Sequence, residues 1–203
     1  MTELQVERVL ETQLDRHAEV TAAMRDQLPQ VQAVADELIR RLAAGGVLYT
    51  YGNGGSAADA QHLVGELIGR YLRERRPLPA VALIGDAAVV SCIANDYSYD
   101  DVFARQVEAL ARPQDIVVGF STSGTSPTVV KGLAAARANG ACSVAFTSRR
   151  GQDLAAAADL AVVVPADETA RIQEMHLLAL HLISELVDRW AAGTDHPKTV
   201  ESP

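Results

Sequence analysis

Two clusters of side chains in this sequence could carry acid–base or metal chemistry. His62 and Glu66 are four residues apart in a segment with helical periodicity. That spacing places both side chains on one helical face, about 6 Å apart along the axis. Imidazole and carboxylate groups bind zinc and also transfer protons near neutral pH. By itself, however, such a pair is more typical of a weak contact on the helix surface.

The second cluster lies in the last apolar-periodic segment and contains Gln173, His176 and His181. Gln173 and His181 would be about 12 Å apart along an ideal helix and rotated by about 80° around it. They could reach one ion only if both side chains lean toward the gap between them. His176 is nearer to Gln173, so helix geometry alone does not select among these residues.

Two loops carry the second kind of chemistry, which is the binding of an anion. In Gly52–Ser56 (GNGGS) the glycines allow close backbone approach to a ligand, and Ser56 is placed to cap the following helix. The loop lacks the lysine of a Walker motif and the spacing of a dinucleotide fingerprint. A capped tight turn explains it equally well.

The second loop, 121–126 (STSGTS), has hydroxyl groups on five of its six residues and directly follows an apolar run. Hydroxyls at the start of a helix, with the backbone N–H groups there, form a neutral site for phosphate. A polar connector is the alternative, but the density of hydroxyls favours phosphate binding.

Short apolar runs separated by helical segments indicate the elements that position these loops. A parallel sheet with helices on both faces is expected from such alternation. We therefore predict an α/β fold with one five-stranded, doubly wound, flavodoxin-like sheet, in which ligands bind beyond the carboxyl ends of the strands. The expected strands are Val47–Tyr51, Ala80–Ile84, Asp115–Phe120, Cys142–Phe146 and Leu160–Pro165.

The helices expected around this sheet begin with an N-terminal extension. Residues 1–45 are predicted to form two helices broken near Pro29, used for packing or oligomerisation. Residues 46–192 form the core, with helices predicted at Ala57–Arg75, after Asp86, at Asp101–Ala111, at Ser126–Asn139 and at Thr169–Trp190. Residues 193–203 are expected to be a flexible tail.

Composition and charge exclude several classes of function. The chain has 18 Lys and Arg against 26 Asp and Glu, a formal net charge of −8, which argues against nucleic-acid binding. We interpret the basic run Arg70–Arg76 as a solvated helix end. No segment has the composition of a signal peptide or membrane span, so we expect a cytoplasmic protein with no membrane partner, in which Cys92 and Cys142 are reduced and buried.

Four motifs taken in order resemble one family. GNGGSAADAQH (52–62), Asn95–Asp96, STSGTS (121–126) and ARIQEMH (170–176) are similar to the motifs of SIS (sugar isomerase) domains, and specifically of phosphoheptose isomerases. The resemblance covers nearly the whole chain. It implies a single SIS domain that interconverts sedoheptulose 7-phosphate and D-glycero-D-manno-heptose 7-phosphate by enediol or enediolate proton transfer.

The resemblance also implies the role of each site residue. It assigns proton transfer to Glu66 and His181, and one zinc ion per subunit to His62, Glu66, Gln173 and His181, leaving His176 without a role. It further implies a homotetramer. Glu66 and Gln173 count as substrate-binding as well, and the phosphate and sugar contacts are expected from Ser121, Thr122, Ser123, Ser126, Asn53, Gly54, Gly55, Ser56, Asn95 and Asp96.

Three alternatives remain beside this reading. A non-catalytic SIS regulator that binds the replication initiator DnaA shares the glycine loop, the serine loop and RIQEMH, but lacks the acid–base pair that Glu66 and His181 form here. Isomerases of arabinose 5-phosphate carry a lysine after the glycines, where this chain has Gly55–Ser56. Enzymes acting on muramic acid phosphate have a different glycine loop. The anomer of the product, its pathway and a catalytic or structural role for zinc stay open.

Overall fold

A computed structural model of the 203-residue chain describes residues 2–194 and shows the predicted α/β fold. The five strands form one sheet in the order β2-β1-β3-β4-β5, and every neighbouring pair is parallel. The predicted five-stranded, doubly wound arrangement is thus confirmed. The strands are β1 (Leu48–Gly52), β2 (Ala80–Ala82), β3 (Ile116–Phe120), β4 (Cys142–Ser148) and β5 (Leu160–Val164).

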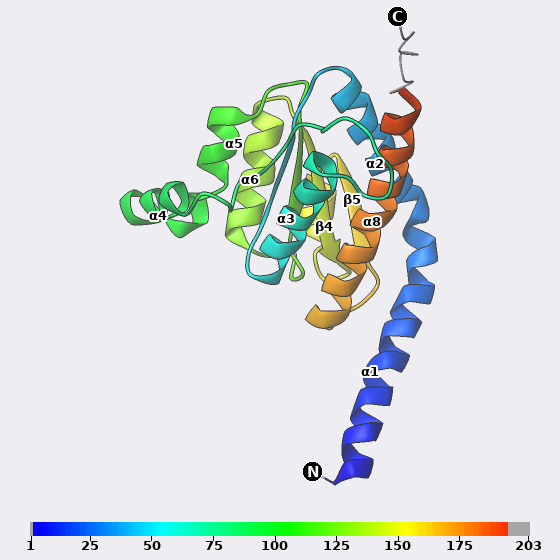
Figure 1. Cartoon of the computed structure of the whole chain (residues 1–203). Coiled ribbons are helices and arrows are strands. Elements are labelled where there is room, and N and C mark those ends of the chain that lie inside the picture. Colours follow the sequence, from blue (N-terminus) through cyan, green and yellow to red (C-terminus); the bar gives the residue numbers. More distant parts are fainter. Residues whose placement is uncertain (1, 195–203) are drawn as a thin grey trace, which may run out of the picture.

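Helices cover both faces of the sheet (Figure 1). Alternate residues of a strand point to opposite faces, so Val118 of β3 packs with one set of helices and Val117 with the other. The first set contains α2 (Leu28–Ala43), α3 (Gly55–Ile68) and α8 (Thr169–Thr194), and the second contains α4 (Ala87–Asp96), α5 (Ala104–Leu110), α6 (Pro127–Ala138) and α7 (Gln152–Ala157).

The direction in which the chain moves through the sheet reverses between β1 and β3. From β1 the chain passes through α3 to β2 on one side, whereas from β3 it passes through α6 to β4 on the other. Ligands of doubly wound sheets bind at such a reversal, beyond the carboxyl ends of the strands. The glycine loop follows β1 and the serine loop follows β3, so both predicted loops lie where we expect the ligand-binding crevice.

The N-terminal helix α1 (Glu3–Ala23) extends away from the body of the molecule (Figure 1). It begins with a capping box at Thr2 and ends in the 3₁₀ turn η1 (Met24–Gln27), while Pro29 lies in the first turn of α2. No residue of α1 is buried, and apolar side chains such as Leu4 and Leu14 are exposed. Within residues 2–194, no helix is long and apolar enough to span a membrane.

The prediction that the helix after the glycine loop continues to Arg75, with Arg70–Arg76 as its solvated end, is wrong. Helix α3 ends at Ile68, and residues 69–79 form a connection without regular structure that we call the strap. Arg75 is buried within it and pairs with the buried Asp188 of α8. The helix ends before Gly69. Arg75 then pairs with Asp188, so its side chain is buried although the charged run around it predicted exposure to solvent.

Three smaller predictions also need correction. Cys92 is exposed on α4, whereas Cys142 is buried as expected, and both are free thiols. The strand predicted at 80–84 is only three residues long, because its pairing with β1 covers Ala80–Ala82 and a turn follows. Helix α8 continues to Thr194, past the predicted end, and the remainder of the predicted tail lies outside the described residues.

Candidate active site

Helices α3 and α8 bring His62, Glu66 and His181 together. The Nε2 atoms of His62 and His181 are 3.1 Å apart, and His62 Nε2 is 2.9 Å from Glu66 Oε1. The two histidines come from segments 119 residues apart in the sequence. Helix spacing alone indicated a surface contact between His62 and Glu66. In the structure, the two residues are part of a cluster of three.

The three ligand atoms of this cluster all lie within 4.8 Å of one another. Two imidazole nitrogens bound at about 2.0–2.1 Å to one tetrahedral zinc ion would be roughly 3.3 Å apart. The observed separation of 3.1 Å between the His62 and His181 nitrogens is close to this value. A pair of imidazoles and a carboxylate is also a donor set that suits zinc. These residues thus fit a metal ion.

Gln173, the fourth predicted ligand, contacts the start of α3. A Cβ atom added to Gly55 would come within 2.1 Å of Gln173 Nε2, so the amide packs directly against this glycine. Gly55 precedes His62 by about two helical turns, or roughly 10 Å. The carboxamide lies along the same α3–α8 contact and faces the glycine loop.

Burial shifts the protonation of two groups in this region. Burial and the neighbouring His62 lower the pKa of His181, and Glu66 partly opposes this. Burial raises the pKa of Asp59 to about 6, against an opposing effect of His62. Asp59 Oδ2 is buried without a hydrogen-bond partner. The sequence reasoning missed this carboxyl, although its place three residues before His62 could have drawn attention to it.

The serine loop folds its hydroxyls around a tight turn. Gly124 has a positive φ of 70°, and its N–H donates to Ser121 Oγ at 3.1 Å, while Thr125 N–H donates to Ser123 Oγ at 3.2 Å. Ser121 Oγ also lies 3.4 Å from Ser126 Oγ. Ser126 is the N-cap residue of α6, but its side chain makes no capping hydrogen bond. Its hydroxyl thus remains available at the start of the helix.

Asn53 connects the glycine loop to the opposite side of the crevice. Its Nδ2 donates to Thr128 Oγ1 of α6 at 2.7 Å, and its Oδ1 accepts from the Tyr99 hydroxyl at 3.0 Å. Tyr99 lies in the 3₁₀ turn η2 (Tyr99–Asp101). Sequence patterns gave no signal for Tyr99 or Thr128, because both act through contacts between distant segments.

Ser56 does not cap α3 as predicted. The N-cap residue is Gly54, with a positive φ of 57°, and Ser56 lies buried in the first turn of the helix. Helix α3 starts two residues earlier than a serine cap at 56 requires, because the positive φ at the N-cap position is open to Gly54.

Asn95 and Asp96 lie at the end of α4, on the side of the molecule away from α8 (Figure 1). Their side chains make contacts on this helix: Asn95 Nδ2 donates to Asp96 Oδ1 at 2.7 Å, and Cys92 Sγ lies 3.5 Å from Asp96 Oδ2. Within one chain, the structure therefore does not bring this pair to the cluster of His62.

His176 of α8 is fully buried against β3 and β4. Its Nε2 lies 3.2 Å from the carbonyl oxygen of Thr147, and its ring meets the edges of Phe120 and Phe146. Burial lowers its pKa to about 4, so the ring is neutral at pH 7. These contacts give His176, to which the family resemblance assigned no role, a place in the packing of the core.

Comparison with known proteins identifies the class of this fold and site. The SIS-domain model matches residues 14–148, which is more than half of the chain. The chain belongs to the SIS-domain family.

Similar proteins narrow this class to one group. The chain is 48% identical over 163 residues to a phosphoheptose isomerase of Roseiflexus sp. (strain RS-1), covering 80% of this chain and 83% of the relative. It is 44% identical to that of Geotalea daltonii, covering 91% and 96%. The structure of the phosphoheptose isomerase of Neisseria gonorrhoeae superposes with a TM-score of 0.86 at 34% identity, covering 91% and 99%. Within the SIS proteins, the chain is thus a member of the phosphoheptose isomerase group.

Proposed function

We propose that this protein interconverts sedoheptulose 7-phosphate and D-glycero-D-manno-heptose 7-phosphate. The observation that carries the proposal is the convergence of Glu66 and His181 in a chain 48% identical to a phosphoheptose isomerase. The Roseiflexus relative and the Neisseria structure carry that name, so the alternative of a non-catalytic regulator is not favoured.

The reaction moves one proton between neighbouring carbons. A base removes a proton from C1 of the ketose, the electrons form the enediol or enediolate, and a proton is then delivered to C2. A second group transfers the proton between the two sugar oxygens. We assign these roles to Glu66 and His181, whose side chains meet at the α3–α8 contact. The lowered pKa of His181 keeps its imidazole neutral near pH 7 and thus able to accept a proton.

The serine loop is proposed to hold the phosphate end of the substrate. Ser121, Thr122, Ser123 and Ser126 supply hydroxyl donors at the N-terminus of α6, where the helix dipole favours an anion. The sugar would extend toward Asn53, Gly54, Gly55 and Ser56, with Gln173 and Glu66 beyond them. This direction follows the crevice from β3 to β1.

Zinc is the metal that we propose for His62, Glu66 and His181, with Gln173 as an additional ligand. When bound, it would supply a Lewis acid that stabilises negative charge on the sugar oxygens. Metal analysis of the purified protein should give one zinc per chain. A chain that binds no zinc and still isomerises would contradict the metal assignment and leave the acid–base pair in place.

Assembly and location complete the proposal. We propose a homotetramer, because the apolar side chains of α1 are exposed in one chain and because Asn95 and Asp96 lie away from the cluster of the same chain. A second copy could bring these residues to a site. The two free cysteines are typical of a reducing compartment such as the cytoplasm.

Conversion of sedoheptulose 7-phosphate in deuterated water tests the function. We expect aldose phosphate with deuterium at C2, because the shuttled proton exchanges with solvent. Product without deuterium would keep the isomerase and require a shielded proton. Absence of product from folded protein that still binds the sugar phosphate would reject the isomerase and favour a binding protein.

A further inference from the structure

The strap is fixed to α8 by one buried carboxylate. Asp188 is fully buried, and its Oδ2 accepts hydrogen bonds from the backbone N–H groups of Leu72 at 3.0 Å and Arg73 at 2.6 Å. Its Oδ1 accepts from Arg75 Nε at 3.1 Å. The guanidinium of Arg75 is 1% exposed, so this is a desolvated ion pair. Such pairs persist where their remaining hydrogen bonds are satisfied.

Arg75 uses its other N–H groups to cap the end of α3. Its Nη1 donates to the carbonyl oxygens of Leu67 at 2.8 Å and Gly69 at 2.9 Å, and its Nη2 donates to that of Glu66. The last carbonyls of a helix have no partner within the helix, and a cation is favourable there. The buried pair thus fixes the helical turn that carries Glu66.

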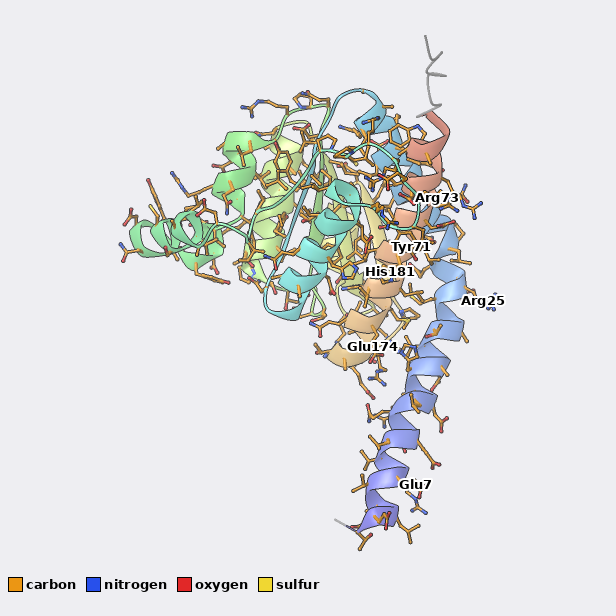
Figure 2. All side chains as sticks on the ribbon, viewed as in Figure 1. Glu7, Arg25, Tyr71, Arg73, Glu174 and His181 are labelled. Carbon is orange, nitrogen blue, oxygen red and sulfur yellow. The ribbon has the colours of Figure 1, made fainter. Side chains whose placement is uncertain are left out.

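The same strap places Tyr71 on His181. The two rings are stacked, with centroids 5.6 Å apart and planes inclined by 29°. Figure 2 shows Tyr71 next to His181, and it shows Arg73 of the strap beside a later part of α8. Asp188 lies seven residues after His181, which is about two helical turns on the same face of α8. One helix therefore carries both the imidazole and the carboxylate that holds the strap over it.

We propose that Tyr71 is a positioning residue for His181, and that the Arg75–Asp188 pair holds Tyr71 and Glu66 in register. The inference rests on the proposed isomerase function for its kinetic consequence, but the contact itself does not depend on it. Stacking restricts the rotation of the His181 ring and leaves its Nε2 directed at His62. The ring of tyrosine, rather than its hydroxyl, supplies this restriction, because no hydrogen bond of that hydroxyl is involved in the contact.

Tyr71→Ala, Tyr71→Phe and the control Glu74→Ala test the proposal. Glu74 lies in the same strap, and its side chain is 92% exposed. The first measurement is the NMR signal of the His181 ring in zinc-free, histidine-labelled protein, assigned by its loss in His181→Gln. We expect Tyr71→Ala to remove the ring-current shift of this signal, and Tyr71→Phe and Glu74→Ala to keep it.

Kinetics with sedoheptulose 7-phosphate provide the second measurement. We expect Tyr71→Ala to lower kcat by about 10- to 100-fold, as for a misplaced catalytic group, with little change in KM. Tyr71→Phe should retain kcat within about threefold, since stacking requires only the ring. Should Tyr71→Ala not fold, Tyr71→Leu replaces it, and Asp188→Asn should shift the His181 signal in the same direction.

The outcomes separate this inference from the proposed function. An unchanged His181 signal and kcat in Tyr71→Ala would overturn the inference. Equal losses in Tyr71→Ala and Tyr71→Phe would also overturn it, because the hydroxyl would then be the active part. If the unaltered protein shows no turnover while the His181 signal responds as expected, the positioning stands and the isomerase proposal fails.

Discussion

The candidate site has two halves that are built in different ways. The serine loop is one continuous segment, in which Ser121, Ser123 and Gly124 make their hydrogen bonds within a few residues. The proton-transfer half joins His62 and Glu66 to His181 from another helix, and it needs the strap behind them. A loop of the first kind depends on local backbone geometry, whereas a cluster of the second kind depends on the packing of α3 against α8.

The largest expected effect separates chemistry from phosphate binding. Glu66→Gln should lower kcat by about 10²- to 10⁴-fold, because an amide cannot take a proton from carbon. Binding of the sugar phosphate, measured by calorimetry, should change little, because the serine loop is intact. Glu74→Gln is the matched control, since that exposed carboxylate lies in the strap. Comparable losses of binding and turnover in Glu66→Gln would mean that the two halves do not act separately.

The next effect concerns the tertiary support of the proton-transfer half. Asp188→Asn should lower the free energy of unfolding by about 3–5 kcal/mol, because it leaves Arg75 buried without its counter-charge. Glu185→Gln removes the partner of Arg73 in a pair that solvent screens, so it should cost less than Asp188→Asn. Urea unfolding measures both. A similar cost for the two variants would show that burial of the Arg75–Asp188 pair is unimportant.

A third effect is a pH dependence of stability that originates at His176, which is buried against Phe120 and Phe146. Its pKa is about 4 in the folded protein against an ordinary 6.5, because burial disfavours the charged ring. Above pH 6.5 the neutral ring costs the folded protein nothing. As the pH falls toward 4, the unfolded chain takes up the proton first, and about 3 kcal/mol of the free energy of unfolding is lost in total. His176→Gln should remove this part of the pH dependence, measured by urea unfolding of zinc-free protein.

Asp59 changes the stability in the opposite direction over the same pH range. Its pKa of about 6 lies above the ordinary 3.8, so its contribution is greatest below pH 3.8 and is lost as the pH rises toward 6. The two groups partly cancel in the unaltered protein. His176→Gln should therefore show stability that falls with rising pH between 4 and 6, and a flat profile in this variant would contradict the raised pKa of Asp59.

The smallest effect tests the locally built half. A Cβ atom on Gly124 would lie 2.1 Å from Gly151 Cα, so Gly124→Ala forces the loop to move. We expect a loss of about 1–3 kcal/mol of stability and roughly tenfold weaker binding of the sugar phosphate, with kcat retained. Gly45 also has a positive φ, but a Cβ atom added there has no other atom within 4 Å. Gly45→Ala should therefore lower the free energy of unfolding by about 1 kcal/mol and leave binding unchanged. Equal binding by both variants would exclude the serine loop as the phosphate site.

The sequence by itself predicted the sheet and the loops at its edge. Each strand is a short apolar run and each following helix has its own periodicity, so local patterns suffice to predict them. The crevice then follows from two loops after parallel strands. The zinc and proton-transfer roles of His62, Glu66, Gln173 and His181 came from the family resemblance and remain predictions. What the fold adds is that three of these side chains meet.

Only the tertiary structure decided the support of the proton-transfer half. The sequence predicts that Arg75 is a solvated cation, because the seven-residue run 70–76 that contains it is mostly charged. In the structure it is buried on Asp188, which is 113 residues away in the chain. Cys92 reads as buried because its neighbours are apolar, yet its helix lies at the edge of the fold. Periodicity describes which residues share a helical face, but the burial of a charge and the stacking of Tyr71 depend on which distant segment covers that face.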